Sequence, residues 1–144
     1  MTFLDAYALV ALVADEPPAA EVEEILRQDE ARVVVINLAE AVDIAHRVHG
    51  ITTQEVKAAI EPLLLGNALA VAISDEPQAW LAAEIRTKHY DKKTASLSMA
   101  DCLLLAHGVT DGGPIATSDP PLAAIAATLG VEVVGLPDSS GNRP

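Results

Sequence analysis

The stretch "RVVVINLAEAVDIAHRVHG", residues 32–50, joins a predicted strand to a predicted helix. Its first part, "RVVVI" (32–36), is a continuous β-branched run, which is typical of a strand buried on both faces. Its second part, "NLAEAVDIAHRVHG" (37–50), has apolar residues spaced for one helical face, and Gly50 is placed to end the helix. The residues expected on that face are Leu38, Ala41, Val42, Ala45 and Val48. A strand followed at once by a helix is the repeating unit of α/β folds.

The same alternation of strand and helix extends along the whole chain. Further apolar runs predict strands at residues 1–4, 69–74, 114–118 and 131–136. Helical patterns occupy residues 6–15, 15–28, 52–66, 75–90, 98–107 and 119–130. We therefore expect an α/β fold: a three-layer α/β/α sandwich whose central sheet is mostly parallel and has about five strands. We expect one domain over residues 1–136 and a disordered tail at 137–144.

Composition limits the classes of function. The chain has 144 residues, 51% of them hydrophobic, and a single cysteine, Cys102, which we expect to be a small core residue in a reducing, cytoplasmic setting. No stretch predicts a membrane span or a signal peptide. The net charge of −12, with only nine Lys and Arg, argues against nonspecific nucleic-acid binding. Clustered carboxylates that bind a divalent cation, or an acidic surface for a basic partner, remain as options.

Four acidic residues lie where predicted helices begin. They are Asp5 after the first strand, Glu40 shortly after the second, Asp101 in "LSMADCLLLAHG" (97–108), and Asp119 before Pro120. In a parallel α/β fold the helix N-termini meet at the carboxyl edge of the sheet, so these carboxylates are predicted to converge there.

Helix capping is the simpler explanation for each acid taken alone. Asn37 with Glu40, and Ser98 with Asp101, have the spacing of capping boxes, while Asp5 and Asp119 are suitable N-caps. Several acids brought to one edge would repel one another unless they were protonated or bridged by a cation, and a hard divalent ion such as Mg²⁺ or Mn²⁺ prefers such ligands. Asp75, which also follows a strand, is assigned to capping alone.

The segments "FLDAYALVAL", "INLAEAVD", "LSMADCLLLAHG" and "IATSDPPLAAIAATLGVEVV" together resemble, in order and spacing, a PIN-domain protein of the VapC type, the ribonuclease toxin of type II toxin-antitoxin systems. The resemblance covers the chain up to about Leu136. It implies that Asp5, Glu40, Asp101 and Asp119 form the acidic quartet of a Mg²⁺- or Mn²⁺-dependent ribonuclease. It also implies that Thr117 orients a ligand from the second shell. Many relatives carry Ser, Thr or Asn where this chain has Tyr7.

The resemblance also implies a mechanism and partners. One or two metal ions would activate water for in-line attack on an RNA phosphodiester. Asp5 and Asp101 are expected as direct ligands, Glu40 as a ligand or water-positioner, and Asp119 at a second metal or in an outer-shell contact. The expected partners are the RNA substrate, a cognate VapB-like antitoxin whose basic segment suits the acidic chain, and a second copy in a homodimer.

Other polar residues receive more modest assignments. His46 and His49 could pair on a metal but are expected on a solvated face, and Asp43 is expected at the surface rather than in the acidic site. The basic run "EIRTKHYDKK" (84–93) either contacts RNA phosphates or complements a helix C-terminus. Its basic candidates are Arg86, Lys88, Lys92 and Lys93. Trp80 and Tyr90 are expected to serve packing rather than base stacking.

Two other classes of protein share part of this sequence pattern. A response-regulator receiver is also an acidic α/β domain, but it needs paired acids after its first strand and a Lys after its fifth, whereas here Asp5 stands alone and Pro137 follows Leu136. The stronger alternative is a catalytically silent PIN-like module whose acidic face binds a basic protein partner. The complete quartet of acids favours the nuclease over this module.

Overall fold

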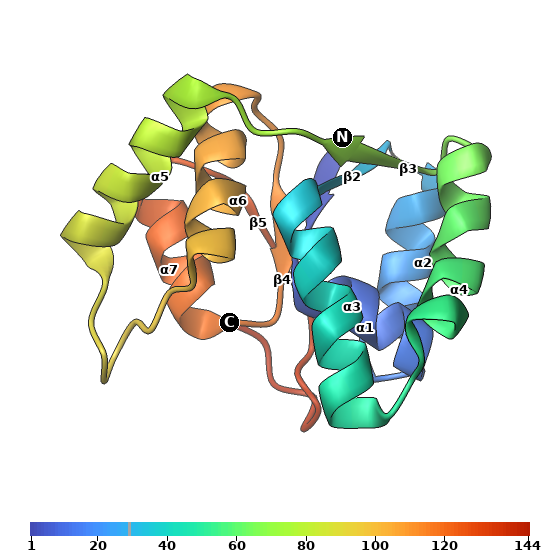
Figure 1. The fold of residues 1–144 in the computed structure, drawn as a ribbon. Coiled ribbons are helices and arrows are strands. Elements are labelled where there is room, and N and C mark those ends of the chain that lie inside the picture. Colours follow the sequence, from blue (N-terminus) through green and yellow to red (C-terminus); the bar gives the residue numbers. More distant parts are fainter. Residues whose placement is uncertain (29) are drawn as a thin grey trace.

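A computed structural model describes residues 1–28 and 30–144, and it contains a central parallel sheet (Figure 1). The strands described are β1 (Thr2–Leu4), β2 (Ala31–Val34), β3 (Leu69–Ala72), β4 (Ile115–Thr117) and β5 (Val133–Gly135). They lie in the order β3-β2-β1-β4-β5, and every pairing is parallel. Because the chain returns to the same edge before each strand, the carboxyl ends of all strands face one way. The predicted α/β fold with a parallel sheet is confirmed.

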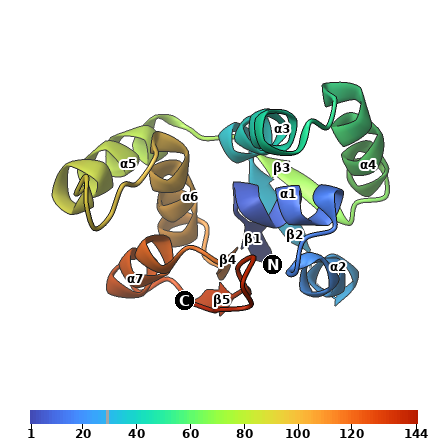
Figure 2. The same ribbon diagram turned by 90° about the horizontal axis from the view of Figure 1, so that it is seen from below.

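Helices cover both faces of the sheet. They are α1 (Ala6–Ala14), α2 (Ala19–Gln28), α3 (Val35–His49), α4 (Thr53–Leu65), α5 (Glu76–His89), α6 (Met99–Thr110) and α7 (Pro120–Thr128). Figure 2 shows α1 to α4 gathered on one side of the sheet and α5 to α7 on the other. The three-layer sandwich expected from the alternating pattern is therefore present.

Two apolar cores result from the alternation of side chains along each strand. Phe3 packs with α5, α6 and α7, whereas its neighbour Leu4 packs with α1 to α4. Val33 and Val34 of β2 divide between the two cores in the same way. Successive residues of a strand point to opposite faces, so a strand that is apolar at every position must be covered on both sides.

The junction between β2 and α3 differs from its prediction. The strand ends at Val34, and Val35 and Ile36 form the first turn of α3, where they are 45% and 40% exposed. Asn37 is thus inside the helix, and the predicted capping box of Asn37 and Glu40 is wrong; Val34 holds the N-cap position without a side-chain hydrogen bond. A β-branched run favours a strand but does not encode where the strand ends, and tertiary packing decided it here.

The predicted apolar face of α3 is correct except at its end. Ala41 and Ala45 are buried, and Leu38 and Val42 pack against them. Val48 is 63% exposed, because no described residue covers the last turn of α3 on that side. Gly50 ends the helix in the left-handed region (φ 68°), as predicted.

A buried polar cluster fixes α5 against α6. His107 of α6 is 1% exposed; its Nε2 lies 3.0 Å from Ser74 Oγ and its Nδ1 lies 2.7 Å from Asp111 Oδ2. The Gln78 amide of α5 donates to Thr110 Oγ1 at 2.9 Å. Burial would raise the pKa of Asp111, but the hydrogen bonds from His107 and Thr110 outweigh it and lower that pKa. These directional contacts hold the antiparallel helix pair in one orientation.

Asp75 begins α5 with the capping box that its assignment requires. Its Oδ1 accepts a hydrogen bond from the Gln78 N–H at 2.9 Å, and Gln78 Oε1 accepts one from the Asp75 N–H at 3.0 Å. The assignment of Asp75 to capping is confirmed.

The chain after β5, for which the sequence predicts disorder, is described in the structure as a hydrogen-bonded turn. Asp138 Oδ1 accepts hydrogen bonds from the backbone N–H groups of Ser140 and Asn142 at 2.8 and 2.9 Å. Arg143 then pairs with Glu21 of α2 at 2.6 Å. Both partners of this pair are about half exposed, so solvent screens the pair and it contributes little to stability.

None of the helices in the described ranges is long and apolar enough to cross a membrane.

The close approach of α6 to β4 and to the segment before β5 gives a test of the packing. A Cβ placed on Gly108 would lie 2.9 Å from Val131 Cγ1 and 3.1 Å from Ile115 Cδ1. Gly108→Val should therefore lower the free energy of unfolding by about 1–3 kcal/mol, measured by urea denaturation.

Val109→Ala, at a half-exposed position of the same helix, serves as the control and should change stability little. Adding Val131→Ala to Gly108→Val should recover part of the loss, because it removes the methyl groups that the new side chain meets. Equal stability of Gly108→Val and the wild type would contradict this account of the packing.

Candidate metal centre

Asp5 caps α1 from a buried position. It follows β1 directly, is 4% exposed, and accepts a hydrogen bond from the Ala8 N–H through Oδ1 at 2.7 Å. Burial raises the pKa of Asp5 to about 7. The Thr117 hydroxyl and the Ala8 N–H lower this pKa, while the negative charges of Asp101 and Asp119 raise it further. Asp5 is therefore a buried carboxyl group whose neighbours are other acids.

Asp101 sits in the first turn of α6 and forms the predicted capping box with Ser98. Asp101 Oδ2 accepts a hydrogen bond from the Ser98 N–H at 2.9 Å, and Ser98 Oγ accepts one from the Asp101 N–H at 3.0 Å. The helix behind it is anchored by Cys102, Leu104 and Leu105, which are fully buried. The capping role is confirmed, and it leaves Asp101 Oδ1 outside the box.

Glu40 lies in the second turn of α3 and faces the same group of acids. Its pKa is raised by burial and by the charge of Asp101, and slightly by Asp43, while the nearby Asn37 amide acts in the opposite direction. Asn37 is fully buried, and neither its Oδ1 nor its Nδ2 has a hydrogen-bond partner among the described residues.

Asn37 is a candidate site residue that the sequence interpretation missed, because it was assigned to a cap. A buried amide without partners is costly, so its retention needs an explanation. Its signal was present in the sequence as a polar residue three positions before Glu40 in an otherwise apolar stretch, which places both on one helical face.

Asp119 occupies the N-cap position of α7 but does not cap it. Its carboxylate makes no capping hydrogen bond; instead its backbone N–H donates to Thr117 Oγ1 at 3.0 Å. Asp119 therefore holds the predicted N-cap position without a complete capping hydrogen bond, and its backbone is fixed by the fully buried Thr117. Burial and the charge of Asp101 raise the pKa of Asp119, against an opposite effect of the Leu122 N–H.

The four acids form one electrostatic unit centred on Asp101. Its negative charge raises the pKa of each of the other three, Asp5, Glu40 and Asp119. Each of these shifts requires proximity, because charge effects of this kind act over a few ångströms. The structure thus brings together segments that lie more than 110 residues apart in the sequence.

The convergence stops short of a preformed coordination shell. Within residues 1–28 and 30–144, no three His, Cys, Asp or Glu side chains are already arranged to hold a metal ion. The donor set nevertheless fits a hard divalent cation, since it consists of the carboxylate oxygens of Asp5, Glu40, Asp101 and Asp119. A cation between these groups would offset their mutual repulsion.

The remaining acidic and histidine candidates lie outside this unit. His49 Nε2 lies 3.4 Å from Glu16, and His46 Nδ1 lies 3.3 Å from the Ile51 carbonyl oxygen, so the two imidazoles have separate partners on an exposed face. Asp43 is exposed and pairs with Arg47 at 3.0 Å, as expected for a surface role. Tyr7 is half-buried near Asp5. Burial is the largest cause that raises the pKa of Tyr7, followed by the charges of Glu16, Asp138 and Asp5.

The basic candidates lie at the end of α5 and in the link to α6. Lys88, Lys92 and Lys93 are exposed, whereas Arg86 is half-buried and donates from Nε to the Leu97 carbonyl oxygen at 3.2 Å. The Arg86 guanidinium also lies 4.7 Å from the centre of the Tyr90 ring. The expected packing roles of Trp80 and Tyr90 are wrong, since these side chains are on the surface at 67% and 43% exposure.

The raised pKa of Asp5 predicts a pH dependence of stability in the absence of divalent metal. Between pH 3.8 and about 7 the folded chain binds more protons at Asp5 than the unfolded chain does. The free energy of unfolding should therefore fall as pH rises through this window, by on the order of 3 kcal/mol. Asp5→Asn, which keeps the cap acceptor, should remove this part of the slope in urea denaturation with a chelator present.

Asp75→Asn is the matched control, because it replaces an exposed capping carboxylate at the start of α5 and should leave the slope unchanged. A wild-type slope that persists in Asp5→Asn would show that Asp5 is not its source.

Comparisons with known proteins bear on the fold and the family. No curated protein is significantly similar in sequence. Among solved structures, FitAcB from Neisseria gonorrhoeae is 22% identical with a TM-score of 0.62, covering 92% of this chain and 96% of that one. The Mycobacterium tuberculosis toxin VapC20, described as cleaving the sarcin-ricin loop, is 17% identical with a TM-score of 0.69, covering 86% and 94%.

A third structure, VapBC2 from Rickettsia felis bound to a DNA fragment from its promoter, is 14% identical with a TM-score of 0.66, covering 92% of this chain and 96% of that chain. At these identities the likeness concerns the fold. The sequence itself matches the model of the PIN domain over residues 2–128, which takes in all four converging acids and the strands β1 to β4. By this match, and in agreement with the resemblance seen in its motifs, the chain belongs to the PIN domain family.

Proposed function

We propose that this protein is a metal-dependent endoribonuclease and the toxin component of a type II toxin-antitoxin system, acting in the cytoplasm. The observation that carries the proposal is the convergence of Asp5, Glu40 and Asp119 on Asp101, where burial, and to a smaller extent the charge of Asp101, raises the pKa of each. A protein tolerates such repulsion at one edge of a sheet when a cation is to be bound there. Membership of the PIN domain family and the fold shared with VapC20 support the same conclusion.

In this proposal the residues divide the work of the site. Asp5 and Asp101 bind Mg²⁺ or Mn²⁺ directly, Glu40 binds metal or positions water, and Asp119 serves a second ion or an outer-shell contact. An ion held by these carboxylates would supply an activated water and charge neutralisation at the leaving oxygen of the phosphodiester. The Thr117 hydroxyl interacts with the Asp5 carboxylate and accepts a hydrogen bond from the Asp119 N–H, so it fixes the two residues relative to each other.

The proposed partners follow from the solved relatives and from charge. VapBC2 is a toxin-antitoxin pair bound to promoter DNA, and FitAB has also been solved on a DNA fragment. We infer that this chain likewise binds a VapB-like antitoxin and forms a homodimer. Its net charge of −12 favours a basic antitoxin segment as the ligand of its acidic surface.

A catalytically silent binding module is the second candidate, and one observation favours it. Asp5 and Asp101 already serve as helix caps through Asp5 Oδ1 and Asp101 Oδ2. In that case the acids would be structural and the acidic face would bind a basic protein without hydrolysis. The two candidates differ in their response to metal and in RNA cleavage.

Metal binding should be visible as stabilisation. Mn²⁺ or Mg²⁺ should raise the melting temperature of the wild type, because only the folded chain brings the carboxylates together. The double variant Asp5→Asn with Asp101→Asn keeps both cap acceptors but removes two charged ligands, so its rise should disappear in differential scanning fluorimetry. The same rise in both proteins would rule out a metal site at these residues.

Hydrolysis should depend on Asp101 and not on Asp75. With Mg²⁺ or Mn²⁺ present, Asp101→Asn should slow the cleavage of total RNA by about a hundredfold or more, with the cut ends mapped by sequencing. Asp75→Asn should cleave like the wild type, because its box lies at the start of α5, next to the end of α6 remote from Asp101. Equal cleavage by the wild type and Asp101→Asn would favour the binding module.

A further inference from the structure

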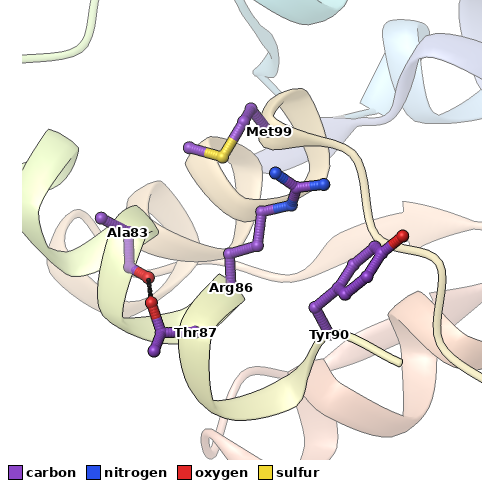
Figure 3. Close-up of a pocket in the computed structure, with 5 residues that line it drawn as sticks. All are labelled: Ala83, Arg86, Thr87, Tyr90 and Met99. Atoms are coloured by element: carbon purple, nitrogen blue, oxygen red, sulfur yellow. Dashed lines mark hydrogen bonds between the residues drawn. The ribbon is translucent and has the colours of Figure 1, made fainter. Parts of the chain in front are cut away.

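A shallow pocket lies beside the start of α6, on the opposite side of that helix from the acidic unit. It has a volume of about 460 Å³ and is lined by Ala83, Arg86, Thr87, Tyr90 and Met99. Figure 3 shows the Arg86 guanidinium extending between the Met99 thioether and the Tyr90 ring. The pocket therefore combines a cation, an aromatic ring and a flexible apolar side chain.

Arg86 is held in place and yet has no acidic partner. Its Nε donates to the Leu97 carbonyl oxygen at 3.2 Å, and its guanidinium lies 4.7 Å from the Tyr90 ring centre. In a chain with 21 Asp and Glu, it forms no ion pair with any residue that the structure describes. A fixed guanidinium whose terminal nitrogens point into an open pocket is suited to bind an anion such as a phosphate.

The apolar lining is suited to a flat ring. Tyr90 is 43% exposed and Met99 is 44% exposed, although neither is needed to fill a core. Single-stranded nucleic acids are bound by basic grooves in which bases stack on aromatic side chains, with Arg adding a cation–π contact. An exposed Lys88 on α5 and the exposed Lys92 and Lys93 after it extend the positive charge beyond the pocket.

The pocket and the acidic unit share the first turn of α6. Met99 and Asp101 are two residues apart in this helix, so their side chains point in nearly opposite directions. A strand of RNA that crosses the N-terminal end of α6 would contact both sites.

We propose that this pocket binds a nucleotide next to the one cleaved at the acidic unit, with its base against the exposed part of the Tyr90 ring and its phosphate on the Arg86 guanidinium that lies between Tyr90 and Met99. The inference rests on the proposed ribonuclease function and adds to it a subsite for single-stranded RNA. In this proposal the link between α5 and α6 contributes to RNA binding.

The test measures binding apart from cleavage. A short fluorescently labelled single-stranded RNA is titrated in the presence of EDTA, and its anisotropy is followed for the wild type, Tyr90→Ala, Tyr90→Phe and Arg86→Gln. Tyr90→Ala and Arg86→Gln should each weaken binding about tenfold, while Tyr90→Phe should bind like the wild type because the ring is kept. Circular dichroism confirms that each variant is folded.

Two matched controls lie outside the pocket. Trp80→Ala removes an exposed aromatic ring from the same helix, and Arg47→Gln removes an exposed Arg from α3; both should leave RNA binding unchanged. A set of RNAs lacking one base at a time gives a second readout. When the missing base is the one next to the mapped cleavage position, Tyr90→Ala should cause no further loss of RNA affinity. When any other base is missing, Tyr90→Ala should still weaken RNA binding.

Unchanged RNA affinity in Tyr90→Ala, an equal loss in Trp80→Ala, or no dependence on the position of the missing base would each overturn the subsite. The subsite would also be overturned if Tyr90→Ala lost affinity for a protein partner but kept its affinity for RNA. The proposed function fails separately: if RNA binding depends on Tyr90 but Mg²⁺ produces no cleavage, the pocket stands and the nuclease does not. If the wild type cleaves RNA but Tyr90→Ala binds RNA as tightly as the wild type, the nuclease stands and the pocket does not.

Discussion

The parallel pairing of β1 with both β2 and β4 is the constraint on which the rest of the structure depends. Because β1 is central and buried at every position, with Phe3 and Leu4 facing opposite sides, both faces of the sheet have to be covered by helices. Parallel strands also place all carboxyl ends on one edge, so whatever follows each strand is brought to the same place. Asp5 and Asp119 meet there because β1 and β4 are neighbours.

The acidic unit combines mechanical support with electrostatic repulsion. Asp101 is carried by a helix whose next turn is fully buried at Leu104 and Leu105, and whose far end is held by the His107 cluster. These contacts stabilise the position of a carboxylate that its neighbours would repel. A rigid scaffold that holds like charges together is typical of sites that bind a cation rather than of caps alone.

Helix N-termini reconcile the two roles of these acids. The partial positive charge at the start of α1 and α6 stabilises a carboxylate. The Ala8 N–H donates a hydrogen bond to Asp5 Oδ1, and the Ser98 N–H donates one to Asp101 Oδ2. A carboxylate has further lone pairs, so accepting one such bond does not use up its capacity to bind a ligand. Capping therefore orients the acids without replacing their chemistry, and Asp119, which does not cap, is oriented through Thr117 instead.

Much of this could be predicted from the sequence, because the evidence is local. Periodicity distinguishes strand from helix, Gly50 ends a helix, and Ser98 with Asp101 has the spacing of a capping box. The positions of the four acids near the starts of predicted helices then place them at one edge of a parallel sheet. These inferences depend only on neighbours in the chain and on the general handedness and direction of α/β units.

Tertiary structure alone decided the rest, because it depends on which surfaces meet. The end of β2 at Val34, the burial of Asn37 beside Glu40, and the exposure of Val48 and Trp80 are set by what lies opposite each residue, and local sequence carries no record of that. The raised pKa values likewise arise from burial and from charges distant in the chain. The sequence determined the order of elements and the identity of the acids; three-dimensional packing determined their proximity, their protonation and the pocket beside them.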